Sequence, residues 1–274
     1  MASKKVFKTV GINIVAWIIS IILITPLVLI LINSLKTSQA AAAMDLSLPD
    51  SIQFENFTTV IEKGKLDTAF LNSLTYSVFS VLLCTLTSSM AAFVLSRNRS
   101  KANKIIYFII VLGITMPINF IALMKVMQAL TIINTKAGII LLYASIQTPF
   151  NVFLIYSFVG KIPRDIDEAA IIDGCSPLRL FFSIVFPLLK PVLVTVMVLT
   201  FLNTWNEYIL PLYFLGNSQH WPMTLAVYNF FGMYFRDWNL ICADIVLTSL
   251  PVIIVYLFGQ KYIVSGMTAG AVKG

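Results

Sequence analysis

A group of polar and aromatic residues interrupts an apolar stretch of the sequence near residue 205. The group consists of Asn203, Trp205, Asn206 and Glu207, and Gln147 lies in an earlier apolar stretch. An indole ring can pack against the CH face of a sugar, and amide and carboxylate groups can bond to its hydroxyls. These residues are therefore candidates for a solute path. A carboxylate at this depth can equally pair with a neighbouring subunit or a lipid headgroup, and Gln147 can simply join two helices.

The sequence contains no residues with the spacing of a catalytic, nucleotide or metal site. His220 is the only histidine and lies in a polar loop without an evident nucleophile. The cysteines, at positions 84, 175 and 242, are odd in number and far apart, which favours neither a disulfide framework nor a metal site. A phosphate-binding loop of the form Gly-x-x-x-x-Gly-Lys-Ser/Thr is not found either. We therefore expect that the chain is not an enzyme and holds no cofactor or metal.

The composition indicates a membrane protein. Of 274 residues, 58% are hydrophobic and 11% are charged, whereas soluble domains have about 45–50% apolar and about 25% charged residues. A mean hydropathy of +0.89 leaves too few polar residues to cover a surface in water. The net charge is +7, but the basic residues occur in short clusters between apolar stretches. This pattern does not favour nucleic-acid binding.

Six apolar stretches reach the length of about 20 residues that a membrane-spanning helix needs. They are residues 14–32, 74–95, 105–123, 137–159, 192–215 and 240–258. We expect an all-α, polytopic protein in which residues 1–274 form one transmembrane domain. The first stretch exceeds the core of a signal peptide, so an uncleaved anchor is favoured over a cleaved signal. Pro117, Pro149 and Pro211 either break helices along a solute path or are ordinary kinks that neighbouring helices tolerate.

The distribution of lysine and arginine predicts the orientation, because cytoplasmic segments retain an excess of both. Basic residues concentrate in the N-terminal tail, residues 97–104, residues 161–190 and the C-terminal tail. The loop at residues 34–68 instead contains more acids than lysines. The sequence therefore predicts that both termini and residues 161–190 are cytoplasmic.

Residues 161–190 predict two short helices joined by a glycine turn. Pro163 suits the first turn of a helix. Three acids follow that complement the positive end of the helix dipole: Asp165, Asp167 and Glu168. Gly174 is placed just beyond the helix end, and Ser176-Pro177 fits the N-cap and first position of a second helix.

This segment resembles the EAA motif of permease subunits in ABC importers. Glu168-Ala169-Ala170 is followed after three residues by Gly174, and later by Ile184 and Phe186-Pro187. The usual motif ends in Leu-Pro, and Phe186 is an apolar replacement. In that family the motif forms a coupling helix, which docks into a groove of the ATPase subunit. The resemblance implies ATPase contacts by Glu168, Ala169, Ala170, Asp173, Gly174, Ser176 and Pro177. The alternative is an amphipathic helix on the membrane surface.

The carboxyl-terminal third is similar to the smaller, six-span permease of maltose-type carbohydrate importers. The likeness is carried by Trp205-Asn206-Glu207 and by the ending Gly270-Ala-Val-Lys-Gly274. Together the two resemblances cover residues 60–274. In the family a segment near residues 216–239 reaches toward the substrate-binding protein. This implies contacts by Trp221, Tyr234, Arg236 and Trp238, although such aromatic residues also anchor proteins at membrane edges.

The resemblance implies a permease in the bacterial plasma membrane that imports a sugar or oligosaccharide. Its expected partners are a second homologous permease, an ATPase homodimer that binds ATP and Mg²⁺, and an extracellular or periplasmic solute-binding protein. The alternatives are an ABC permease for amino acids or phosphate, and a secondary transporter or channel that works alone. An intramembrane enzyme would need paired aspartates, a Ser/His pair or clustered histidines, which the sequence lacks.

Overall fold

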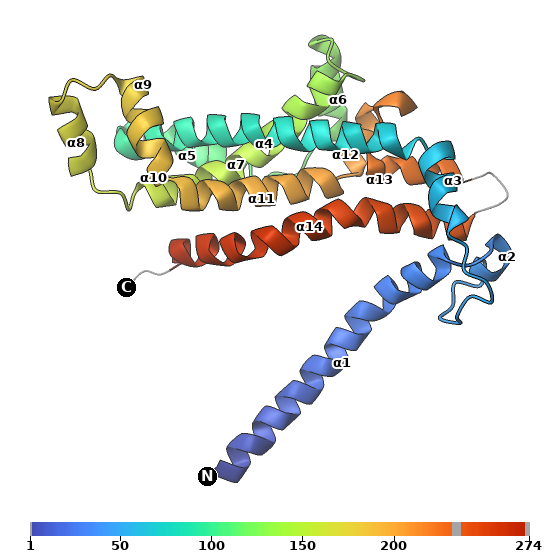
Figure 1. Cartoon of the computed structure of the whole chain (residues 1–274). Helices are drawn as coiled ribbons and strands as arrows, with labels where there is room; N and C mark the ends of the chain where they lie inside the picture. Colours follow the sequence, from blue (N-terminus) through green and yellow to red (C-terminus); the bar gives the residue numbers. More distant parts are fainter. Residues whose placement is uncertain (1, 232–236, 272–274) are drawn as a thin grey trace. The chain divides into compact units, whose positions relative to one another are not determined.

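The fold is built from helices throughout the part of the chain that the structure describes. Figure 1 presents it as a computed structural model, which describes residues 2–231 and 237–271. The helices, in chain order, are α1 (Ala2–Ser34), α2 (Ser38–Ala41), α3 (Glu55–Lys63), α4 (Leu66–Arg97), α5 (Lys101–Leu112), α6 (Phe120–Ala129), α7 (Lys136–Val159), α8 (Asp165–Ile172), α9 (Pro177–Arg179), η1 (Leu180–Val185), α10 (Phe186–Leu188), α11 (Lys190–Asn206), α12 (Ile209–Phe214), η2 (Ser218–His220), α13 (Met223–Ala226), η3 (Val227–Phe230) and α14 (Trp238–Ala271). This confirms the predicted all-α class.

Long apolar helices account for most of the predicted spans. Four described helical stretches are long and apolar enough to cross a membrane. They are Thr9–Ser34, Leu66–Arg97, Lys136–Val159 and Trp238–Tyr262. A bent pair, Pro177–Leu188 and Lys190–Asn206, meets at 79° and adds a fifth if the pair is counted as one span. The expectation of a multi-pass membrane protein agrees with these helices.

The third and fifth predicted stretches do not form continuous helices. In residues 105–123, α5 ends at Leu112, and α6 begins after Asn119, whose side chain accepts a hydrogen bond from the Ala122 amide. Pro117 lies in this break and has no amide hydrogen to extend a helix. In residues 192–215, α11 ends at Asn206. Pro149 and Pro211, by contrast, remain inside α7 and α12.

The chain forms two compact units. The first contains the residues up to Asp67 together with Ala226–Leu250, and the second contains Thr68–Leu225 together with the chain from Pro251 onward. In the second unit, α5 and α11 both pack on α7. Polar bonds reinforce the packing of α11 on α7: Gln147 donates to the Thr204 hydroxyl at 2.8 Å, and Asn151 donates to the Thr200 hydroxyl at 2.9 Å. Such bonds between helices contribute about 1 kcal/mol each in a membrane.

The first unit is held by buried polar side chains. The Asn56 amide donates to the backbone carbonyls of Ser34 and Lys36, and Asn239 donates to the Asn56 side-chain oxygen at 2.8 Å. The buried Lys36 ammonium pairs with Asp45 at 2.6 Å. In α1, by contrast, none of the most apolar 18-residue window is buried. That helix therefore presents its apolar side chains outward.

The Lys36–Asp45 pair makes the stability of this unit depend on pH. Hydrogen bonds from the Lys36 ammonium and then from Ser47 lower the pKa of Asp45 to about 2. The pKa of Asp45 in the folded chain lies below its ordinary value of 3.8. The charged pair therefore stabilises the fold fully above pH 3.8, and this stabilisation is lost as the pH falls through about 2.

We expect Asp45→Asn to lower the thermal unfolding temperature in detergent at pH 7, and the deficit to shrink as pH approaches 2. Asp50→Asn, at an exposed position of the same loop, serves as the control and should behave like the unaltered chain. If Asp45→Asn lowers the unfolding temperature equally at all pH values, the charge of Asp45 does not stabilise the unit.

Candidate functional site

A pocket of about 680 Å³ lies in the second unit. Its residues come from the break between α5 and α6, from α6 and α7, and from α11, α12 and the break between them. They are Gly113, Ile114, Met116, Ile118, Leu123, Leu142, Tyr143, Ser145, Ile146, Gln147, Pro149, Phe150, Asn203, Glu207 and Leu210. The volume falls in the range of about 300–1,000 Å³ that ligand pockets occupy.

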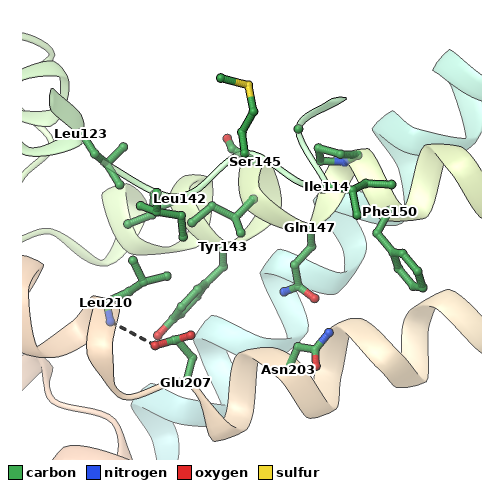
Figure 2. A pocket seen from close by; sticks show the side chains of 15 residues that line it. Ile114, Leu123, Leu142, Tyr143, Ser145, Gln147, Phe150, Asn203, Glu207 and Leu210 are labelled. Carbon is green, nitrogen blue, oxygen red and sulfur yellow. Dashed lines mark hydrogen bonds between the residues drawn. The ribbon is translucent and has the colours of Figure 1, made fainter. Parts of the chain in front are cut away.

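Polar groups from two facing elements meet in this pocket. Figure 2 shows Gln147 on α7 opposite Asn203 on α11, and Tyr143 pointing toward Glu207. The pocket therefore brings together three of the five residues that the sequence singled out for a solute path. Its walls are otherwise largely aliphatic and aromatic, so it combines apolar contact surface with a few hydrogen-bonding groups. This is the usual composition of a small-molecule site.

The other two candidates, Trp205 and Asn206, do not line the pocket. The Trp205 side chain is 1% exposed, stacks on Phe201 and meets Phe70 edge-on. The Asn206 amide donates to the Leu202 carbonyl within its own helix. Two positions along a helix correspond to a turn of about 200°, so Trp205 points to the side of α11 opposite Asn203.

The Glu207 side chain caps the helix that follows the break in the fifth predicted span. Its backbone is extended, and its Oε1 atom accepts hydrogen bonds from the amides of Ile209 at 2.7 Å and Leu210 at 3.1 Å. These amides belong to the first turn of α12 and have no partner within the helix. The Thr224 hydroxyl also donates to the Glu207 carbonyl. The carboxylate therefore stabilises the local backbone while it lines the pocket.

Sequence reasoning missed Tyr143. It lies four residues before Gln147 on α7, and residues at this spacing share one face of a helix. The spacing would have identified it once Gln147 was chosen.

The helix–glycine–helix prediction for residues 161–190 is confirmed. α8 ends at Ile172, and Gly174 adopts the left-handed conformation with φ of 77°. The amide of Cys175 bonds back to the Ala170 carbonyl at 2.9 Å, which closes the helix end. Ser176 then caps the next helix by accepting a hydrogen bond from the Arg179 amide, with Pro177 at its first position. In Figure 1, α8 and α9 lie at one end of the second unit.

Most of the residues singled out in this segment are on the surface. Glu168, Ala169, Asp173, Gly174, Ser176 and Pro177 are exposed. Ala170 is the exception, because it is 6% exposed and packs in an apolar cluster of α7, η1 and α11. Ile172 and Leu178, which the sequence did not single out, are 84% and 65% exposed. Exposed apolar side chains can mark a surface that another protein or a membrane covers.

Of the four residues singled out for contact with a binding protein, the structure describes Trp221 and Trp238. The Trp221 indole donates to the Leu215 carbonyl at 3.0 Å and packs against an apolar cluster. Trp238 begins α14. Tyr234 and Arg236 lie outside the described residues.

Comparison with known proteins identifies the family. The model of the family "Binding-protein-dependent transport system inner membrane component" matches residues 85–269, which is more than half of the chain. A probable permease for starch degradation products, AmyC of Thermoanaerobacterium thermosulfurigenes, is 35% identical over 93% of this chain and 94% of its own length. The diacetylchitobiose uptake permease NgcG of Streptomyces coelicolor is 32% identical over 93% of this chain and 85% of its own length. The melibiose/raffinose/stachyose import permease MelC of Bacillus subtilis is 32% identical over 91% of both chains.

The fold agrees with this assignment. A solved bacterial ABC transporter involved in the import of the acidic polysaccharide alginate contains a chain that superposes with a TM-score of 0.84. The likeness covers 96% of this chain and 98% of that chain, at 23% sequence identity. The resemblance to ABC-importer permeases is thus confirmed, and the family is one of transport permeases rather than enzymes. This chain belongs to the family of inner-membrane components of binding-protein-dependent transport systems.

Proposed function

We propose that this chain is one permease subunit of an ATP-driven importer for a sugar or oligosaccharide. The observation that carries the proposal is α8, an exposed helix with a glycine turn at one end of a membrane-embedded bundle. A helix of this kind gives a separate motor protein a rigid surface on which to act. The names of the relatives, which concern starch products, diacetylchitobiose and melibiose or raffinose, support a carbohydrate as the solute.

The proposed topology has six crossings in one permease domain within a bacterial plasma membrane. The two broken stretches, α5 with α6 and α11 with α12, each count as one crossing in addition to the four long helices. The distribution of basic residues supports cytoplasmic termini and a cytoplasmic α8. The outward apolar surface of α1 suits contact with lipid or with a second homologous permease.

The proposed motor is a homodimer of ATPase subunits that binds ATP and Mg²⁺, with no cofactor on this chain. Its docking surface on this chain would consist of Glu168, Ala169, Asp173, Gly174, Ser176 and Pro177, with the exposed Ile172 and Leu178. Ala170 would instead fasten α8 to the bundle. On the opposite side, a solute-binding protein would contact the region of Trp221, Tyr234, Arg236 and Trp238.

The proposed solute path passes through the pocket at Gln147, Asn203 and Glu207. Its amide and carboxylate groups suit sugar hydroxyls, and the ring of Phe150 suits a sugar CH face. The buried Trp205 would support this region from behind, and the exposed Asn206 would lie outside the pocket. The second candidate function is an ABC permease for a non-sugar solute, since the coupling segment would serve either solute.

Uptake assays test the choice of solute. We expect deletion of this chain in its host to abolish uptake of at least one of three labelled probes, maltotriose, diacetylchitobiose or raffinose, and expression from a plasmid to restore it. Unchanged uptake of all three, together with lost uptake of an amino acid or phosphate, would favour the non-sugar alternative.

Substitutions in α8 and its turn test coupling. Glu168→Arg reverses an exposed charge, and Gly174→Pro forces φ to about −65° where the chain requires 77°. We expect either change to abolish uptake and to detach or uncouple the ATPase, with normal amounts of the chain in the membrane. Asp165→Asn, on the exposed surface of the same helix, should retain uptake. Normal uptake by both substituted chains would refute the coupling role.

Two substitutions separate the roles of Glu207. Glu207→Gln keeps an oxygen that can accept from the Ile209 and Leu210 amides, whereas Glu207→Ala leaves both amides without it. Loss of a helix cap costs about 1 kcal/mol. We expect Glu207→Ala to lower the free energy of unfolding by about this amount and to reduce uptake strongly. Glu207→Gln should retain both the free energy of unfolding and most of the uptake. Equal loss of uptake in both would show that the negative charge itself is required.

A further inference from the structure

A buried ion pair joins α8 to the end of α4. Arg97 is the last residue of α4, and Asp167 lies in the first turn of α8. Arg97 Nη2 donates to Asp167 Oδ1 at 3.3 Å, and Nε lies 2.6 Å from Oδ2 as a charge contact rather than an aligned hydrogen bond. The two side chains are 14% and 12% exposed. A guanidinium and a carboxylate that meet through two atoms each fix orientation as well as distance.

Two backbone contacts reinforce this pair. Arg97 Nη1 donates to the Ile162 carbonyl at 3.1 Å, and Arg164 Nη2 donates to the Arg97 carbonyl at 3.2 Å. Both Ile162 and Arg164 precede α8 directly in the sequence. The end of α4 is therefore bonded to the entry of α8 as well as to its first turn.

The other attachment of α8 is apolar. Ala170 packs in a cluster that includes Ala92 of α4, Val159 of α7 and Val192 of α11. Apolar packing opposes separation, but it is not directional and permits sliding. The ion pair, which is partly shielded from water and salt, supplies the directional part of the attachment.

From α4 the connection continues to the pocket. Ser80 on α4 donates to the Ile140 carbonyl of α7 at 3.2 Å, and Asn151 of α7 donates to the Cys84 sulfur of α4 at 3.1 Å. α7 in turn contributes Tyr143 and Gln147 to the pocket. A displacement of α4 is thus passed to the helix that lines the candidate solute path.

We propose that Arg97 and Asp167 form an ionic clamp that makes α8 and the end of α4 move as one body. A force applied to α8 is then transmitted to α4 and onward to the pocket. The two residues are positioning residues, because neither belongs to the exposed docking surface or to the pocket. The inference rests on the proposed function, in which an ATPase acts on α8.

Distance measurements on the intact complex test the clamp. The complex is isolated from its own membrane through a tag on this chain, with Cys175→Ser to remove the partly exposed thiol. Spin labels are attached at Arg99→Cys and Asp165→Cys, two exposed positions on either side of the clamp. With the clamp intact, we expect one narrow distance distribution that stays the same after addition of ATP and vanadate.

Asp167→Asn and Arg97→Gln should each broaden this distribution and allow it to shift on addition of ATP and vanadate, while the ATPase still co-purifies. Lys101→Gln, which removes a nearby exposed charge, should leave it narrow. If Asp167→Asn does not accumulate in the membrane, Asp167→Glu, which keeps the charge but displaces the carboxylate, is measured with the same expectation. Distributions as narrow and as constant as with the intact clamp would overturn the proposal. If instead the proposed function is wrong, no ATPase will co-purify with the unaltered chain, and this outcome is distinct from failure of the clamp.

Discussion

The arrangement of this protein depends on the requirement that backbone amides and carbonyls at membrane depth find hydrogen-bond partners. In lipid, irregular backbone is tolerated only where protein buries it or where it borders a water-filled cavity. Both interruptions of the predicted spans border the same pocket. Gly113, Ile114 and Met116 from the first break and Glu207 from the second line one pocket. The two breaks in the helices therefore form part of the wall of the pocket.

Side chains satisfy the helix ends that these breaks create. Asn119 accepts from an amide at the start of α6, and Glu207 accepts from two amides at the start of α12. The same carboxylate faces the pocket, so a group needed for the fold is also available to a solute. In the segment proposed to contact the ATPase, Gly174 supplies a left-handed turn after α8, and Glu168, Ala169 and Asp173 are exposed.

The sequence predicted the features that depend on local pattern. Apolar length identified α1, α4, α7 and α14, and the order of proline, acids, glycine and Ser-Pro predicted α8 and its turn. A break at Pro117 was one of two interpretations of that proline, whereas the end of α11 at Asn206 was missed, because the apolar stretch continues there while the helix does not. The side chain of Trp205 was assigned to the path because its type suits sugars, yet packing on Phe70 and Phe201 buries it. The contact of Arg97 with Asp167 joins residues far apart in sequence, and only the tertiary fold reveals it.

We infer that the broken helices enclose a path open to water. Substituted-cysteine labelling of the assembled transporter tests it directly with a membrane-impermeant thiol reagent applied to both sides of the membrane. We expect Asn203→Cys to react and its reaction to change on addition of ATP and vanadate. Ile253→Cys, on the outward apolar surface of α14, should not react. If Asn203→Cys does not react in any state from either side, the pocket is not part of a path open to water.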